Sequence, residues 1–293
     1  MESAIVSGIS GHLGHEVARQ LLLSGVRTIG LTRRPVEHLG MAGVDWHRID
    51  GRTETLLEVF QQTRPDTVLH LAGLSRREHV SGDVSAFVEA NILLGAQLLE
   101  AMRVVGGRRF ITAGTYLQHA SDGTPRPFNL YAATKLAFED IAAYYAEAYG
   151  IAVARLTLSD IYSEHDTRPK LMTDLANAWA TGAAVVVRDA GARVDLIHLE
   201  DAAAAFLDAA SWLEQGHVSG ALACYSVSSG ADISALELVS LFESIGGRGL
   251  RAEVGTGKPS PRSVKPWRGA AVPGWAPRIN LEQGIARIIA ARK

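Results

Sequence analysis

The first half of the chain alternates short apolar runs with longer stretches in which apolar residues recur every three or four positions. The short runs are typical of buried strands, and the longer stretches are typical of amphipathic helices. The expected strands span 4–6, 26–31, 44–49, 67–71, 109–113 and 151–158, and the expected helices span 13–23, 53–62, 84–105 and 131–149. Strands that alternate with helices predict an α/β fold whose parallel, doubly wound sheet is covered on both faces.

After residue 158 the pattern becomes less regular. The expected helices are 171–181, 200–213, 233–245 and 279–291, and the expected strands are 184–188, 194–198 and 221–226. Glycine and proline gather between residues 255 and 277, which predicts a long irregular segment of the kind that usually has a function. We therefore expect the chain to form a large domain and a smaller C-terminal lobe, which covers the carboxyl ends of the strands of the large domain. The large domain is 1–158, with 194–226 and 279–293 returning to it, and the lobe is 159–193 and 227–278.

Composition excludes several classes of protein. The 29 basic and 31 acidic residues give a formal net charge of -2, which is too balanced to attract nucleic acid. Cys224 is the single cysteine, so the chain has no internal disulfide and no thiolate metal cluster. No apolar run approaches the roughly 20 residues of a membrane helix, and the N-terminus lacks a signal-peptide pattern. We therefore expect a cytoplasmic protein that binds neither membrane nor nucleic acid.

Three glycines spaced three residues apart follow the first expected strand. Gly8, Gly11 and Gly14 stand where a strand turns into a helix. Residues without a Cβ permit a tight turn, close approach to a pyrophosphate, and close packing of the helix, whose N-terminus faces the phosphates. The spacing alone arises by chance in a glycine-rich chain, and its position between strand and helix is what makes it informative. It predicts a Rossmann-type dinucleotide site in which the turn residues that bind the cofactor are Gly8, Ser10, Gly11, His12 and Leu13.

The end of the second strand indicates which dinucleotide is bound. A chain that binds NAD normally presents Asp or Glu there to the ribose hydroxyls. Here Thr32 is followed by Arg33 and Arg34. Paired guanidinium groups can hold a 2′-phosphate and stack on adenine, so these three residues predict NADP(H). The alternative is a solvated basic loop.

Tyr131 and Lys135 lie four residues apart at the start of an expected helix, and therefore on one face of it. A phenol with a pKa of about 10 is a poor acid-base group at neutral pH, but a nearby ammonium favours the phenolate and lowers that pKa. Lysine is scarce in this chain, which makes the pairing more informative. Thr112 and Thr115 supply hydroxyls near the end of the fifth strand. Thr115 is preferred as the donor to a substrate carbonyl, because Thr112 lies within the strand.

These motifs together resemble the extended short-chain dehydrogenase/reductase family, also described as NAD-dependent epimerases and dehydratases, over nearly the whole chain. The residues that carry the resemblance are the glycine triple, Leu71-Ala72-Gly73, Asn91, Thr115, Tyr131, Lys135, Asp50, the segment Asp195 to Asp201, and Trp275-Ala276-Pro277. The resemblance implies that Thr115, Tyr131 and Lys135 are catalytic. It also implies further cofactor contacts from Asp50, Gly51, Leu71, Ala72, Gly73, Asn91, Tyr131, Lys135 and Leu158. Members act mostly on nucleotide-linked sugars, usually as homodimers packed through the helices that correspond to 84–105 and 131–149.

The chain departs from the family pattern at three places. Val194 stands where the family has an Arg that contacts the substrate diphosphate, with Arg193 one residue away. The segment 160–164 reads Asp-Ile-Tyr-Ser-Glu instead of Asn-Val-Tyr-Gly-Pro. Tyr116 and Leu117 replace the Asp-Glu pair that the 4,6-dehydratases carry after the catalytic Thr. The acid and base of the elimination step are therefore missing, which argues against a dehydratase.

Three functions fit these residues. The favoured one is an NADPH-dependent reductase of a nucleotide-linked 4-keto-6-deoxy sugar, since the segment from Asp160 to Leu171 resembles deoxysugar 4-ketoreductases best. The alternatives are a nucleotide-sugar 4-epimerase and a non-catalytic NADP-binding regulatory protein. The basic residues of the smaller lobe considered for the substrate diphosphate are Arg168, Lys170, Arg188, Arg193, Arg262, Lys265 and Arg268. The predicted substrate-binding set is Thr115, Tyr116, Arg168, Lys170, Arg193 and Arg262. The histidines show no paired ligand spacing, so no metal is expected.

Overall fold

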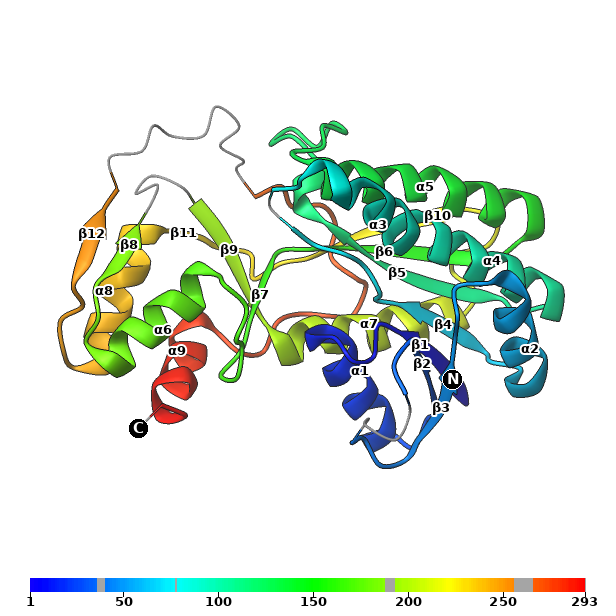
Figure 1. The fold of residues 1–293 in the computed structure, drawn as a ribbon, viewed down its shortest axis with the longest axis horizontal. Helices are drawn as coiled ribbons and strands as arrows, with labels where there is room; N and C mark the ends of the chain where they lie inside the picture. The colour runs from blue at the N-terminus through cyan, green and yellow to red at the C-terminus, as the bar shows by residue number, and fades with distance from the viewer. Residues whose placement is uncertain (36–39, 77, 188–192, 256–265, 293) are drawn as a thin grey trace.

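The computed structural model describes residues 1–35, 40–76, 78–187, 193–255 and 266–292. Its main sheet has seven strands in the order β10-β6-β5-β4-β1-β2-β3, and all of its strand pairs are parallel (Figure 1). The strands are β1 (Ser3–Ser7), β2 (Arg27–Thr32), β3 (Val44–Arg48), β4 (Thr67–His70), β5 (Arg109–Thr115), β6 (Ala152–Leu158) and β10 (Leu222–Val227). The order reverses between β1 and β4, where open α/β sheets bind ligands. The predicted Rossmann-type fold is confirmed.

Helices cover both faces of this sheet. One face packs against α1 (His12–Leu23) and α7 (Leu199–Glu214), and the other against α2 (Thr53–Thr63), α4 (Leu94–Val105) and α5 (Leu130–Tyr149). Side chains of a strand alternate between faces, so Val6 joins the core on the α1 side while Ile5 joins the opposite core. Both faces of the sheet are apolar because both are buried.

The helix expected at 84–105 is present but is not a uniform α-helix. After the short turn η2 (Ser81–Asp83), α3 (Val84–Val88) passes through a π turn, η3 (Glu89–Leu93), into α4. Length and composition alone would allow the stretch Ser81–Val105 to cross a membrane, contrary to the expectation that no run is long enough. Core helices pass the same test, and here Leu98 and Leu99 are fully buried in the core shared with α2 and α5.

The smaller lobe has its own core. A three-stranded sheet joins β7 (Asp160–Tyr162), β9 (Arg193–His198) and β11 (Asp232–Ser234), and a second pairing joins β8 (Val185–Val187) to β12 (Ala252–Val254). The helices α6 (Leu171–Thr181), α8 (Ala235–Gly246) and α9 (Leu281–Ala290) pack with them around Leu175, Phe242 and Ile285.

Two segments lie elsewhere than the sequence pattern predicts. The final helix α9 was expected to return to the large domain, and instead it packs on α6 and α8 in the smaller lobe (Figure 1). Its apolar face, which includes Ile288 and Ile289, finds its complement in that lobe's core. Strand β9 also pairs with β7 and β11 rather than with the main sheet. Of the segment 194–226, α7 and β10 are the elements that return.

Candidate active site

The turn between β1 and α1 is packed so closely that it leaves no room for side chains. Gly8 has a φ of +73°, and a Cβ there would lie 2.5 Å from the Ala72 nitrogen. A Cβ at Gly14 would lie 2.2 Å from the Gly8 oxygen, so α1 rests directly on the turn. Gly11 is the N-cap residue, and no side chain caps α1 there. The first N–H groups of α1 are therefore open to an anion, which fits the pyrophosphate of a dinucleotide.

Three predicted cofactor residues lie at the mouth of this turn. Ser10 is exposed, whereas His12 and Leu13 are half-buried at the start of α1. The Nε2 of His12 lies 3.2 Å from the Ser163 hydroxyl, so the turn contacts the loop that leads into the smaller lobe. Burial, together with the nearby Arg168, lowers the pKa of His12.

Two arginines follow β2 at the same edge of the sheet. The buried Thr32 accepts a hydrogen bond at its Oγ1 from the Arg34 nitrogen at 2.9 Å, which shapes the turn after the strand. Arg33 and Arg34 are exposed, and within the described ranges neither is engaged in an ion pair. Two exposed guanidinium groups that have no carboxylate partner among the described residues suit a 2′-phosphate.

The loop after β3 lies at the neighbouring strand end. Asp50 pairs with Arg52 at 2.7 Å, and hydrogen bonds from the Arg52 backbone and the Thr55 side chain help lower the pKa of Asp50 to about 2. Gln97 of α4 donates to the Gly51 oxygen at 2.8 Å and so holds this loop against the helix layer. The expected cofactor residues Asp50 and Gly51 thus lie on a loop held by α4.

Asn91 fastens the loop after β4 to the helix layer. Its side chain is buried at the π turn, where its Oδ1 accepts from the Leu74 nitrogen at 2.8 Å. Its Nδ2 donates to the Leu74 oxygen at 3.1 Å and to the Thr134 hydroxyl of α5 at 2.9 Å. These bonds fix the segment that contains Leu71, Ala72 and Gly73. Asn91 therefore holds the backbone of that segment, and the Lys135 ammonium lies against Gly73.

Tyr131 meets two hydroxyls at the carboxyl edge of the sheet. Asn129 caps α5 by accepting from the Ala132 nitrogen at 3.0 Å, which sets Tyr131 in the first helical turn. The Tyr131 side chain forms hydrogen bonds with Thr115, at the end of β5, and with Ser75, in the loop after β4. The Thr112 hydroxyl is buried inside the sheet and has no hydrogen-bond partner within the described residues. The geometry thus places Thr115, and not Thr112, beside the phenol.

The pKa values of Tyr131 and Lys135 differ from what the sequence predicts. Burial raises the pKa of Tyr131 to about 12, although the Ser75 and Thr115 hydrogen bonds oppose the rise. Burial also lowers the pKa of Lys135 to about 8, and the Glu139 carboxylate partly opposes that change. The predicted lowering of the Tyr131 pKa by Lys135 is therefore wrong for this state of the protein: burial raises the pKa, and the groups that oppose the rise are Ser75 and Thr115. Tyr131 is a protonated hydroxyl at neutral pH.

The predicted substrate residues Tyr116, Lys170 and Arg168 lie close together. The Tyr116 hydroxyl donates to the Asp160 carboxylate at 3.0 Å, and the Lys170 ammonium lies 3.4 Å from the same carboxylate. These side chains lie near Tyr131, whose pKa the charge of Asp160 also raises. Arg168 and Lys170 both donate to the Ile161 oxygen, at 3.2 and 3.4 Å. Arg168 also pairs with Asp166, which lies 3.8 Å from His12 at the glycine turn.

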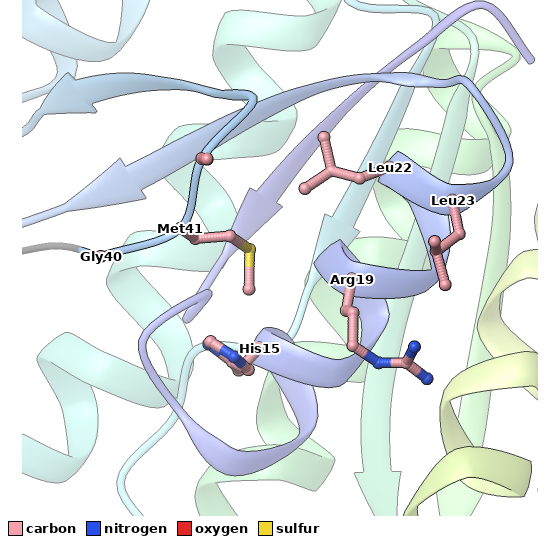
Figure 2. Close-up of a pocket in the computed structure, with 7 residues that line it drawn as sticks. His15, Arg19, Leu22, Leu23, Gly40 and Met41 are labelled. Atoms are coloured by element: carbon pink, nitrogen blue, oxygen red, sulfur yellow. The ribbon is translucent and has the colours of Figure 1, made fainter.

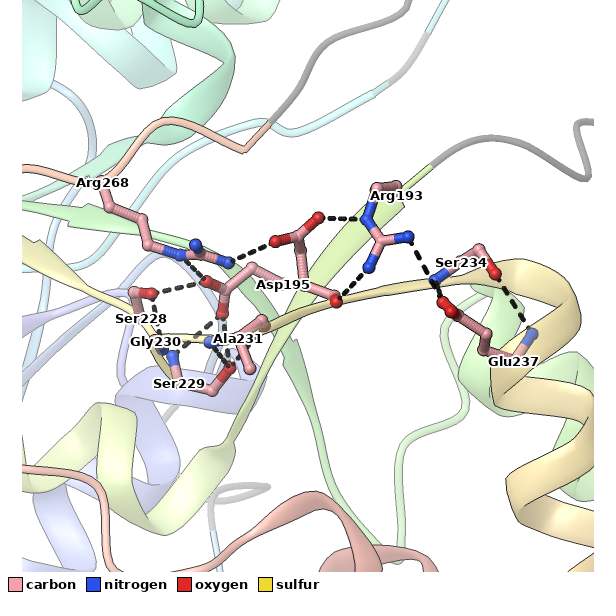
Figure 3. Close-up of polar contacts among 10 residues, drawn as sticks. Arg193, Asp195, Ser228, Ser229, Gly230, Ala231, Ser234, Glu237 and Arg268 are labelled. Atoms are coloured by element: carbon pink, nitrogen blue, oxygen red, sulfur yellow. Dashed lines mark hydrogen bonds and ion pairs between the residues drawn. The ribbon is translucent and has the colours of Figure 1, made fainter.

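Arg193 belongs to an ion-pair network within the smaller lobe (Figure 3). Its guanidinium bonds the Asp232 carboxylate, donates to the Asp232 oxygen at 2.7 Å, and lies 3.4 Å from Glu237. Arg268 bridges Asp195, at 2.6 Å, to Asp232, at 3.2 Å. The predicted contact of Arg193 with a diphosphate would require it to leave its carboxylates, and Val194 packs against the lobe's core. Arg188, Arg262 and Lys265 lie outside the described residues.

A pocket beside α1 lies apart from Tyr131. It has a volume of about 390 Å³ and lies between the helix and the segment that leads into β3. His15 and Met41 both line it (Figure 2). Elsewhere in the described part of the chain, no group of three His, Cys, Asp or Glu side chains is arranged to hold a metal ion. Absence of a metal stays a prediction.

Several site residues were not found from the sequence. Ser75 lies far from Tyr131 along the chain, and no spacing rule connects them. Gln118, which follows Thr115, bonds the Thr115 backbone, and Glu139 in turn bonds Gln118. Glu139 had a detectable signal, because it lies four residues after Lys135 and thus on the same helical face.

The amino-acid sequence of this chain is similar to that of known enzymes. A model of the NAD dependent epimerase/dehydratase family matches residues 4–222. CDP-abequose synthase of Salmonella typhimurium is 22% identical over 98% of this chain and 97% of its own length. UDP-glucose 4-epimerase of Lacticaseibacillus casei is 26% identical over 96% of this chain and 93% of its own length.

Solved structures share the fold. MoeE5 in complex with UDP-glucose and NAD superposes with a TM-score of 0.82 at 23% identity, covering 99% of this chain and 98% of that one. The UDP-glucuronic acid 4-epimerase of Bacillus cereus, in complex with UDP-glucuronic acid and NAD, gives 0.83 at 18% identity with the same coverage of 99% and 98%. The family match spans most of the chain and includes both the glycine turn and the Tyr131 site. The chain therefore belongs to the NAD dependent epimerase/dehydratase family, the extended short-chain dehydrogenase/reductases that its motifs resemble.

Proposed function

We propose that this protein is an NADPH-dependent reductase that converts a nucleotide-linked 4-keto-6-deoxy sugar to its 4-hydroxy product. The observation that carries the proposal is the position of the Tyr131 phenol beside the Thr115 hydroxyl at the carboxyl edge of the sheet. Reduction of a ketone requires a proton donor at the carbonyl oxygen, and a phenol whose pKa is about 12 is in the donor form at neutral pH.

Each side chain then has a defined task. Thr115 donates a hydrogen bond to the carbonyl oxygen and polarises it, and Tyr131 delivers its proton to that oxygen as the C–O bond becomes a hydroxyl. Lys135 holds its positive charge beside the nucleotide site and stabilises the phenolate that remains. The hydride for the carbonyl carbon would come from NADPH when it is bound. The residues that would hold it are those of the glycine turn, with Arg33 and Arg34 on its 2′-phosphate.

The substrate class rests on the relatives and on the side chains around Tyr131. One curated relative is named as a synthase of CDP-abequose, and one solved neighbour holds UDP-glucose. Tyr116 and Lys170 converge on Asp160 beside Tyr131, which supplies polar groups for a sugar ring and a cation for its diphosphate. The Thr115-Tyr116-Leu117 sequence lacks a carboxylic acid next to the threonine, which argues against water elimination.

A 4-epimerase is the second candidate. Curated relatives include UDP-glucose 4-epimerases, and several solved neighbours contain NAD. An epimerase must first oxidise its substrate, a step that calls for a phenolate, and it retains NAD. Arg33 and Arg34 at the ribose position suit NADPH and favour the reductase. A non-catalytic binding protein would have no use for Tyr131 or Lys135.

We also propose that the protein forms a homodimer through the layer of α3, α4 and α5. Large apolar side chains are exposed along this layer, which is unusual for a surface in contact with water. They are Val84, Val88, Leu93, Val104, Tyr144 and Tyr149. A second copy related by a twofold axis would cover this layer with the same helices of the partner.

The proposal is tested by mixing purified protein with NADPH and a panel of nucleotide-linked 4-keto-6-deoxy sugars, and following the loss of NADPH absorbance. Stoichiometric oxidation of NADPH with formation of the 4-hydroxy sugar is the expected result. Turnover of a 4-hydroxy nucleotide sugar without net redox change, and of no keto sugar, would establish the epimerase instead.

A further inference from the structure

A buried polar network lies directly behind Thr115. The turn η4 (Tyr116–Gln118) follows β5, and the Oε1 of the buried Gln118 accepts a hydrogen bond from the Thr115 nitrogen at 2.7 Å. The Nε2 of Gln118 donates to one carboxylate oxygen of Glu139. The other oxygen of Glu139 accepts from the buried Arg155 of β6 at 2.6 Å. The backbone of Thr115 is thus connected to an ion pair beneath the sheet edge.

The surrounding chain is shaped to hold this network. A Cβ at Gly114 would lie 2.9 Å from the Gln118 Oε1 and 3.0 Å from the Arg155 Cδ, so the network occupies the space that a side chain would need. Arg155 also lies 3.2 Å from the Nε2 of His119, whose ring packs on Trp267 with centroids 4.3 Å apart. Trp267 therefore closes the network on the side of the irregular C-terminal segment.

Glu139 also belongs to the helix that carries the reactive pair. Tyr131, Lys135 and Glu139 recur every four residues along α5, which places them on one face. The carboxylate favours the charged form of the buried Lys135 and raises its pKa against the effect of burial. The other titratable group close to Lys135 is His70 of β4, whose pKa burial lowers to about 3, so that it stays neutral. Glu139 itself faces Arg155, with His119 and Cys224 nearby.

We propose that Glu139 is a positioning residue for the oxidoreductase chemistry at Tyr131. Through Gln118 it fixes the backbone, and hence the hydroxyl, of Thr115, and from the next turn of α5 it stabilises the ammonium of Lys135. The effect of Glu139 on kcat rests on the proposed function. Its stabilisation of the Lys135 ammonium concerns only the chain's own residues.

Because the ion pair between Glu139 and Arg155 is buried, replacing both residues together can separate the positioning role of Glu139 from a structural one. Replacing a buried pair with apolar residues of similar size is often neutral or stabilising, whereas removing one partner strands a buried charge. The double variant Glu139→Met/Arg155→Met removes both charges together and is expected to fold. Gln118→Met leaves the ion pair intact and breaks the link to Thr115. Glu147→Gln, an exposed carboxylate farther along α5, is the matched control.

The test combines kinetics with a titration that needs no substrate. The protein is labelled with lysine carrying ¹³C at Cε, and the few lysines of the chain allow the Lys135 resonance to be assigned with Lys135→Arg. We expect the Lys135 titration to move to lower pH in the double variant and to stay in place in Gln118→Met and Glu147→Gln. We expect kcat to fall at least tenfold in both the double variant and Gln118→Met, with little change in KM.

Two results would overturn the inference. One is a folded double variant, judged by circular dichroism and melting temperature, whose Lys135 titration matches that of the wild type. The other is a folded Gln118→Met variant with unchanged kcat. If the wild type reduces no keto sugar, the proposed function fails, and the NMR titration still decides whether Glu139 stabilises the ammonium.

Discussion

The ammonium nitrogen of Lys135 occupies the space that a side chain at position 73 would need. A Cβ on Gly73 would lie 3.1 Å from the Lys135 Nζ and 3.0 Å from the Asn91 Oδ1. The loop after β4 and helix α5 therefore meet at a glycine. The glycine that the family motif contains is explained here by the room it leaves for the Lys135 side chain.

Replacing Gly73 with Ala is expected to displace Lys135. Because the ammonium must shift to make room for the Cβ, the kcat/KM for NADPH oxidation should fall by about tenfold, which corresponds to about 1.4 kcal/mol of transition-state stabilisation. Gly82→Ala is the matched control, since a Cβ there would meet nothing within 4 Å. Steady-state kinetics of both variants check the prediction, and equal activity in the two would contradict it.

Tyr131→Phe is expected to remove the proton donor while leaving the ring in place. General acid catalysis contributes roughly 10²–10⁴-fold, so turnover should fall by at least about 100-fold. NADPH binding, followed by fluorescence titration, should stay within about threefold because the phenol is not a phosphate contact. Tyr225→Phe on β10 serves as the control. A Tyr131→Phe enzyme that keeps its activity would sink the assignment.

Arg33 and Arg34 are expected to set the cofactor preference. Charge-assisted hydrogen bonds contribute about 1.5–3 kcal/mol each, so removing both in Arg33→Ala/Arg34→Ala should weaken NADPH binding by at least about 100-fold and barely alter NADH binding. Calorimetric affinities for the two cofactors, measured side by side, provide the check. Tighter binding of NADH than NADPH by the wild type would show that the arginines form only a solvated loop.

The pH dependence of kcat/KM is expected to report Lys135. Its pKa of about 8 lies below the ordinary value for lysine, so the ammonium is present below pH 8 and is lost as the pH rises through 8. Tyr131, with a pKa of about 12, stays protonated throughout this range. Activity should therefore decline on the alkaline side near pH 8, as measured by initial rates with saturating NADPH. A flat profile up to pH 10 would contradict the requirement for a charged Lys135.

The proposed dimer predicts the effect of charge on α3 to α5. Val88 and Leu93 expose 43% and 46% of their surface, and Val88→Glu/Leu93→Glu should convert a dimer to a monomer in sedimentation velocity. Val186→Glu, at an equally open apolar site on β8 of the smaller lobe, should leave the dimer intact. A wild-type protein that sediments as a monomer at micromolar concentration would exclude the dimer.

Much of this architecture can be derived from local patterns in the chain. Strands of the main sheet and the helices between them follow from short-range periodicity, because each element must present an apolar surface to a core. The glycine turn is a set of residues spaced three apart that lack a Cβ, all within one short segment. Tyr131 and Lys135 are linked by helical spacing, which needs no tertiary information.

Other features depend on which surfaces meet after folding. The apolar face of α9 is evident in the sequence, but its partners α6 and α8 are not, since an apolar stripe does not specify its complement. The pKa of Tyr131 is governed by burial and by Ser75, and neither is written in the spacing to Lys135.

For long polar side chains, the sequence gives the charge and the tertiary structure decides the partner. Arg193 is basic in any conformation, but whether it meets a substrate or Asp232 depends on the pairing of β9 with β11. Local order along the chain was therefore enough to predict the glycine turn and the pairing of Tyr131 with Lys135. The charges around them were decided by the tertiary structure, because burial and long-range contacts arise only when distant segments pack together.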